Sequence, residues 1–303
     1  MASALVVGEP GSGVTTFVGL LYTAVVRFGN EEADGFRFHA ERESIQRIQE
    51  IYSSLGSGHF PEVTLGGEST PLTFMFGFRR SGLSSDSDFD SVPVQVAELQ
   101  AEDIAEIEKH NPVLDDPTRQ LLRSTVVVPL VNAALLSPET GGIDGLPMAR
   151  YDHALARTFE IVARFLAVER NRKARRLYPL FVLTQFDRIP AATLQALEAP
   201  AGSPTEWARA DRVGFGARLL DRHLPETGRY LFHARDARVV VAPPIWFFSE
   251  LGLDPKVGDE PRIRRRSRVP VGGWEPEYPY EEYRGLLMEI GRLARRGPSV
   301  ATA

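Results

Sequence analysis

The chain has 303 residues, of which 43% are hydrophobic and 25% charged, and its formal net charge is −5. This composition is typical of a globular protein that can bury a full core. The negative charge argues against a general nucleic-acid-binding protein, because contacts with phosphates need an excess of lysine and arginine. The sequence contains no cysteine, which excludes disulfides, thiolate metal sites and a cysteine nucleophile.

Neither a targeting signal nor a membrane segment is recognisable. Met1-Ala2-Ser3 runs directly into an apolar segment, without the basic region and cleavage site of a signal peptide. No apolar run approaches the ~20 residues of a membrane-spanning helix. We therefore expect a cytoplasmic protein without a membrane span.

Hydrophobic patterns predict strands that alternate with helices along the chain. The expected strands are 4–7, 36–39, 71–78, 92–96, 125–131, 180–183 and 239–242, and the expected helices are 17–28, 41–55, 152–169 and 281–296. Unbroken, β-branched runs such as 125–131 are typical of central parallel strands covered on both faces. Residues 171–176 are expected as a solvated basic end of a helix. This order predicts an α/β fold with a mostly parallel central sheet and helices on both faces, forming one enlarged domain over 1–303 with loop insertions near 79–91, 136–150 and 253–280.

Residues 8–16 match a phosphate-binding P-loop that has lost its lysine. The ordinary pattern is G-x-x-x-x-G-K-[ST], and Val14 stands at the lysine position. The predicted phosphate-binding residues are Gly8, Gly11, Ser12, Gly13, Val14, Thr15 and Thr16, with Thr15 at the position whose hydroxyl binds Mg²⁺. Backbone N–H groups at the start of a helix attract phosphate without any lysine. The alternative is a glycine-rich turn without a ligand.

A second pattern, Thr184-Gln185-Phe186-Asp187, follows the expected strand 180–183. GTPases read guanine with [NT]-K-x-D at such a strand end. The carboxylate of Asp187 could accept hydrogen bonds from the guanine N1–H and N2–H₂ groups, a pair that adenine cannot offer. Gln185 replaces the lysine whose stem packs on the base. The alternative role for Asp187 is an N-cap of a short helix.

A third motif is missing. The loop that binds the Mg²⁺ side of the nucleotide reads D-x-x-G in GTPases, whereas this chain has Glu98 at the aspartate position and Ala101 at the glycine position. An alanine disfavours the backbone conformation that the glycine adopts. We interpret this segment as an acidic helix start. Because no residues are spaced for a catalytic triad or a metal site, we name no catalytic residue.

Taken in order, these motifs resemble the TRAFAC-class GTPase domains of bacterial conflict systems, the double-GTPase or GTPase-associated families, which are relatives of Ras- and Arf-like GTPases. Besides the motifs above, the resemblance includes 58–64, 72–78, Tyr151-Asp152, 247–252 and 278–283. It implies bound GTP or GDP with Mg²⁺ through Thr15, a guanine contact from Ser249 and Leu251, a switch threonine at Thr64, and protein partners from the same gene system.

The departures from the family fall where catalysis takes place: Val14, Glu98, Ala101 and Gln185. We favour a pseudo-GTPase that binds guanine nucleotide weakly at most and acts as a regulatory or scaffolding subunit. The alternatives are an active GTPase completed by a partner's arginine or by an arginine in cis (Arg42 or 262–266), and an interaction module with an empty pocket. A Val14 side chain packed on apolar neighbours inside the loop would indicate a purely structural pocket.

Overall fold

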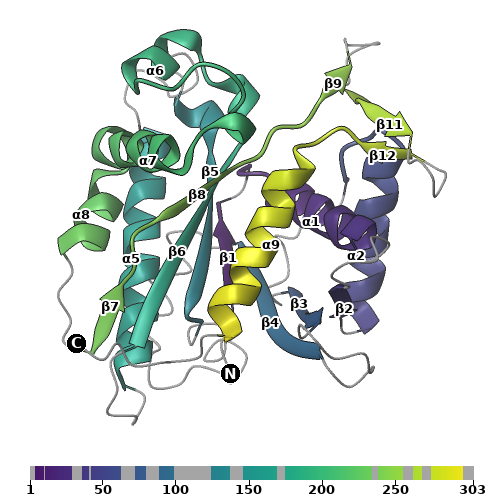
Figure 1. The fold of residues 1–303 in the computed structure, drawn as a ribbon, viewed down its shortest axis with the longest axis horizontal. Helices are drawn as coiled ribbons and strands as arrows, with labels where there is room; N and C mark the ends of the chain where they lie inside the picture. Colours follow the sequence, from purple (N-terminus) through teal and green to yellow (C-terminus); the bar gives the residue numbers. More distant parts are fainter. Residues whose placement is uncertain are drawn as a thin grey trace.

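The computed structural model describes residues 4–9, 11–28, 36–40, 42–62, 72–79, 89–98, 124–136, 146–168, 175–233, 238–254, 262–267 and 274–295. A mainly parallel sheet lies between two layers of helices (Figure 1). The predicted three-layer α/β fold is therefore confirmed. None of the helices in these ranges is both long and apolar enough to cross a membrane.

The sheet has the strand order β2-β3-β4-β1-β5-β6-β7, and β8 also pairs with β6. Its strands are β1 (Ala4–Gly8), β2 (Phe36–Ala40), β3 (Leu72–Arg79), β4 (Phe89–Glu98), β5 (Val126–Asn132), β6 (Arg175–Thr184), β7 (Val239–Val241) and β8 (Ile245–Phe248). All pairs from β4 to β8 are parallel. The β3–β4 pair is antiparallel, as the expected hairpin around 79–91 requires, and β2 pairs antiparallel with β3.

The two helical layers follow from the alternation of side chains along the central strands. On β1, Ala4 and Val6 contribute to one core, while Leu5 and Val7 contribute to the other. The first core is covered by α1 (Val14–Phe28), α2 (Arg42–Gly56) and α9 (Tyr280–Arg295) (Figure 1). The second is covered by α5 (Leu146–Val168), α7 (Arg209–His223) and α8 (Pro225–His233), with the short α6 (Ala191–Ala196) beside them.

Several elements differ from the sequence-based expectation. Arg175 and Arg176 begin β6 and pair with Val239 and Val240, so the prediction that they form a solvated helix end was wrong. The expected loop 253–280 contains four short strands, β9 (Leu253–Asp254), β10 (Arg262–Ile263), β11 (Arg265–Ser267) and β12 (Trp274–Pro276). α5 begins at Leu146 rather than at 152, inside the loop expected at 136–150. Tertiary pairing decides these cases, because the short strands carry no apolar alternation of their own.

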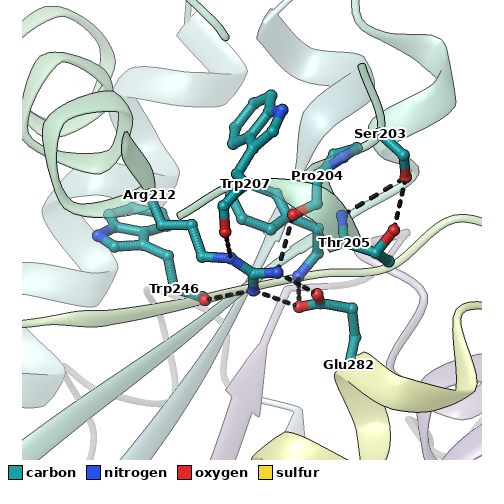
Figure 2. Close-up of polar contacts among 8 residues, drawn as sticks. Ser203, Pro204, Thr205, Trp207, Arg212, Trp246 and Glu282 are labelled. Atoms are coloured by element: carbon teal, nitrogen blue, oxygen red, sulfur yellow. Dashed lines mark hydrogen bonds and ion pairs between the residues drawn. The ribbon is translucent and has the colours of Figure 1, made fainter. Parts of the chain in front are cut away.

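A buried ion pair joins α7 to α9 (Figure 2). The guanidinium of Arg212 donates to both carboxylate oxygens of Glu282, at 2.6 and 2.8 Å. It also donates to the backbone carbonyls of Pro204, Trp207 and Trp246. Glu282 is only 5% exposed and additionally accepts the N–H of Phe248 in β8. The pair therefore fixes the C-terminal helix to the end of β8 and to α7.

Candidate functional site

The predicted P-loop is a strand–turn–helix in the structure. It leaves β1 at Gly8 and enters α1 at Val14. Gly11 and Gly13 have φ of +82° and +83°, which L side chains rarely adopt. The turn is closed by a hydrogen bond from the N–H of Ser12 to the carbonyl of Glu9 at 2.9 Å. The first turn of α1 therefore has the geometry that directs backbone N–H groups toward a phosphate.

Val14, at the position of the lysine, is buried inside this loop. It is 2% exposed and belongs to the core beneath α1 and α2. An alanine Cβ built on Gly8 would lie 2.7 Å from Val14 Cγ2 and 2.4 Å from Ser12 Oγ. The valine methyl and the serine hydroxyl therefore occupy the space that the absent side chain of Gly8 leaves. Val14 points into the loop and packs on apolar neighbours, which is the arrangement expected of a structural pocket.

Side chains from the ends of β5 and β6 hold the carbonyls of the P-loop. Thr184 Oγ1 donates to the carbonyl of Ser12 at 2.7 Å, and Gln185 Nε2 lies 3.4 Å from the carbonyl of Gly11. Asn132 Nδ2 donates to the same Gly11 carbonyl at 3.0 Å, while its Oδ1 accepts the N–H of Ala134. The structure thus brings the predicted residues Thr184 and Gln185 to the P-loop.

Asn132 was not among the residues singled out from the sequence. The available signal was a polar residue that ends a strand of otherwise apolar residues, at the carboxyl end of the sheet where the P-loop also lies. Ligands of open parallel sheets bind at the carboxyl ends of strands, so a polar residue at this edge is a candidate site residue. Here its amide spans two backbone segments and orients Gly11.

The other threonines and the acidic residue of the missing motif lie around the same loop. Thr15 and Thr16 are in the first turn of α1 and are partly exposed. Glu98 ends β4 and pairs in register with Gly8, the first residue of the P-loop. The main chain of Glu98, which stands at the aspartate position of the D-x-x-G motif, therefore lies beside the P-loop. Thr64 and Ala101 lie outside the described residues.

The segments predicted to contact a base lie at the ends of β6 and β8. Gln185 has φ of 54° and precedes the single turn Phe186–Arg188 that carries Asp187. The N–H of Phe186 in this turn donates to the carbonyl of Ser249, the residue after β8, at 3.1 Å. The Ser249 hydroxyl is 2.6 Å from the Tyr283 hydroxyl and is buried, whereas Leu251 is partly buried on the core. Asp187, Ser249 and Leu251 are thus brought to one edge.

An aromatic cluster packs beneath the ends of β6 and β8, on the core side of the two segments that carry Asp187 and Ser249. Phe186, Trp207, Phe215 and Phe248 contact one another with ring centroids 5.1–6.3 Å apart. Phe186 immediately precedes Asp187, and Phe248 immediately precedes Ser249. Edge-to-face aromatic packing adds stability beyond the buried area, so these contacts help to hold the two segments in place.

Two carboxyl groups at this edge have altered proton affinity. The pKa of Asp187 is raised overall, although the residue is exposed. Loss of hydration is the largest cause and outweighs its own backbone N–H and Arg188, which lower the pKa. Glu250 has a raised pKa because of partial burial and because Asp187, Glu277 and Glu282 are negatively charged neighbours. Within the described residues, no group of three or more histidine, aspartate or glutamate side chains could hold a metal ion.

Comparison with known proteins gives remote likenesses only. No protein-family model and no curated protein matches the chain. Among solved structures it is similar to the signal recognition particle receptor SRb-GTP/SRX complex from Chaetomium thermophilum, with 10% identity, a TM-score of 0.39, and coverage of 82% of this chain and 90% of that chain. It is also similar to the S. cerevisiae Ski7 GTPase-like domain bound to GTP, with 12% identity, a TM-score of 0.31, and coverage of 80% of this chain but only 42% of that chain.

Proposed function

We propose that this chain is a GTPase-like protein that has lost hydrolysis, binds guanine nucleotide weakly at most, and acts as a regulatory or scaffolding subunit beside partners of a bacterial gene system. The buried, uncharged Val14 is the observation that supports the loss of hydrolysis. Phosphoryl transfer depends on neutralising charge at the β- and γ-phosphates, and an apolar side chain supplies none. The missing charge-assisted contact is worth about 2–5 kcal/mol.

The residues that keep the GTPase pattern could still bind a nucleotide, although the contact made by the lysine is missing. Backbone N–H groups at the start of α1 would hold phosphate oxygens, and the carboxylate of Asp187 would accept hydrogen bonds from guanine. The Thr15 hydroxyl would meet a Mg²⁺ ion, most of whose ligands would be nucleotide oxygens and waters. We therefore expect weak binding of GTP or GDP, with slow or no turnover.

A second candidate function is an interaction module that binds no nucleotide. It is favoured by the packing of Val14 inside the loop, against the space beside Gly8. In this case the loop is held in shape by Asn132, Thr184 and Gln185 and needs no ligand.

The active-GTPase alternative depends on an arginine from elsewhere. Within the stretch 262–266, Arg264 is paired with Asp254 and Glu277, and Arg266 with Glu275. Arg265 lies over the ring of Trp274. The side chain of Arg42 lies outside the described residues. These carboxylate pairings favour a partner's arginine over Arg264 or Arg266.

Calorimetric titration of GTP, GDP and ATP with Mg²⁺ tests the proposal. We expect weak binding with a preference for guanine, and Val14→Lys should tighten it while the uncharged Val14→Met should not. No binding to either the natural protein or the lysine variant would favour the empty module. Equal affinity for ATP and GTP would remove the role given to Asp187.

Hydrolysis is tested separately. Turnover by the purified protein should not exceed that of Thr15→Ala, because a shortfall of ~4 kcal/mol corresponds to about a thousandfold in rate. Multiple turnover clearly above this control would reject the pseudo-GTPase proposal in favour of an active enzyme.

A further inference from the structure

The short hairpin of β11 and β12 has two chemically different faces. Its register pairs Arg266 with Glu275, and places Arg265 opposite Pro276 and Ser267 opposite Trp274. Because side chains alternate along a strand, Arg266 and Glu275 share one face, while Arg265 and Trp274 share the other. Glu275 on the first face is buried, whereas Arg265 and Trp274 on the second face are exposed.

The first face anchors the hairpin on α1. Arg266 Nε donates to Glu275 Oε1 at 2.6 Å, and Arg27 Nη1 at the end of α1 lies 3.4 Å from the same oxygen. Glu275 is only 5% exposed, and Arg27 also lies 3.8 Å over the ring of Tyr280. The Glu275 carboxylate therefore joins the hairpin to the end of α1.

The second face presents a tryptophan and an arginine to solvent. Trp274 is 57% exposed, and the Arg265 guanidinium carbon lies 5.5 Å from the centre of its ring. Just before the hairpin, the N–H of Ile263 donates to the carbonyl of Gly58, which follows α2, at 2.9 Å. We call Arg265 and Trp274 the Arg–Trp face; Figure 1 shows its hairpin beside the end of α2.

The charge on this face is positive in a chain whose net charge is −5. Arg265 is exposed and has no carboxylate partner in the described part of the chain, whereas Arg262 stands opposite Asp254 in the β9–β10 pair. Arg264, between them, is already neutralised by Asp254 and Glu277. Tryptophan and arginine are the residues that contribute most often to the energy of protein interfaces. The unneutralised Arg265 favours an occupant with the opposite charge.

We propose that the Arg–Trp face binds an acidic segment of a partner protein, with an apolar side chain of that segment packed on Trp274. The surface does not include the P-loop, so this proposal goes beyond the nucleotide question and stands whether or not nucleotide binds. Nucleic acid is the competing occupant, because bases also stack on aromatic and guanidinium groups. The acidic balance of the whole chain argues for the protein segment.

A displayed library of random dodecapeptides, selected against the intact chain, provides the probes. Selected peptides should be rich in aspartate and glutamate around an aromatic or aliphatic residue, and should bind more weakly as salt increases. Trp274 is the exposed tryptophan, since Trp207 and Trp246 are 7% and 3% exposed, so bound peptide should protect its fluorescence from acrylamide quenching.

Two variants and one control decide the outcome. Arg265→Glu and Trp274→Ala should each weaken peptide binding by about thirtyfold, the range of an interface hot spot. Phe232→Ala removes an equally exposed aromatic from α8 and should change nothing. Thermal melting checks that all variants remain folded. Failure to select peptides, unchanged affinity in Arg265→Glu, or tighter binding of a single-stranded oligothymidylate would each overturn the proposal.

Discussion

The hydroxyl of Thr184 donates a 2.7 Å hydrogen bond to the carbonyl of Ser12, which joins the end of β6 to the P-loop. The two residues are separated by 172 positions in the sequence, and both are buried. Through this bond the segment predicted to read a base and the segment predicted to hold phosphate form one unit. Within this unit the carbonyls of Gly11 and Ser12 accept hydrogen bonds from Asn132 and Thr184.

Replacing Thr184 by valine should destabilise the protein by about 1–3 kcal/mol, because the buried carbonyl of Ser12 loses its donor while the shape of the side chain is kept. The free energy of unfolding in urea measures this. Thr193→Val is the matched control, since the Thr193 hydroxyl is also buried but lies 3.5 Å from its acceptor, at the limit of a hydrogen bond. Equal losses in the two variants would contradict a specific role for the Thr184 bond.

The ion pair between Arg212 and Glu282 should behave as a coupled unit. Glu282→Gln should destabilise the chain by about 3–5 kcal/mol, because Arg212 then remains as a largely buried charge without its partner. Arg212→Met combined with Glu282→Leu should cost less than the sum of the two single changes. A double-mutant cycle on the unfolding free energy measures the coupling. Strictly additive effects would show that the pair contributes no more than its separate contacts.

Much of the fold could be predicted because its central strands are unbroken apolar runs and its P-loop carries glycines at defined spacing. The region 188–238 could not, although Phe215, Leu219 and Leu220 are buried on one side of α7. Two glycines inside that helix lower its intrinsic propensity, and packing against the sheet compensates. The strands β11 and β12 are joined by the ion pair between Arg266 and the buried Glu275, which no local pattern reveals.

The residues of the candidate site were also predictable only where their role depends on local sequence spacing. Residues within one motif, such as Gly11, Gly13 and Thr15, could be proposed from spacing alone. Asn132 could not, because its role depends on the register that brings the end of β5 beside Gly11. The orientation of Val14 was also beyond the sequence, since a valine in a first helical turn can face either the core or solvent.

The two glycines of α7 give a matched pair of predictions. An alanine Cβ at Gly216 would lie 2.0 Å from Trp246 Nε1, so Gly216→Ala must displace the indole and should cost about 1–3 kcal/mol. At Gly214 the nearest atom is the flexible end of Arg218 at 3.5 Å. Gly214→Ala should therefore stabilise the helix, by up to about 1 kcal/mol. Chemical denaturation compares them, and a stabilised Gly216→Ala would show that α7 packs differently against β8.

Glu250 should make stability depend on pH. Its pKa is raised in the folded state by partial burial and by Asp187, Glu277 and Glu282. The folded protein therefore holds this proton more tightly than the unfolded chain, and the free energy of unfolding falls as pH rises from the ordinary glutamate value through the raised one. Glu250→Gln removes the penalty, so its melting temperature should exceed that of the natural protein at neutral pH, with the difference vanishing at pH values below the ordinary glutamate value. Glu62→Gln, at an exposed carboxylate, is the control and should change little at either pH. A Glu250→Gln protein that is no more stable than the natural one at neutral pH would show that the carboxylate is compensated by other groups when ionised.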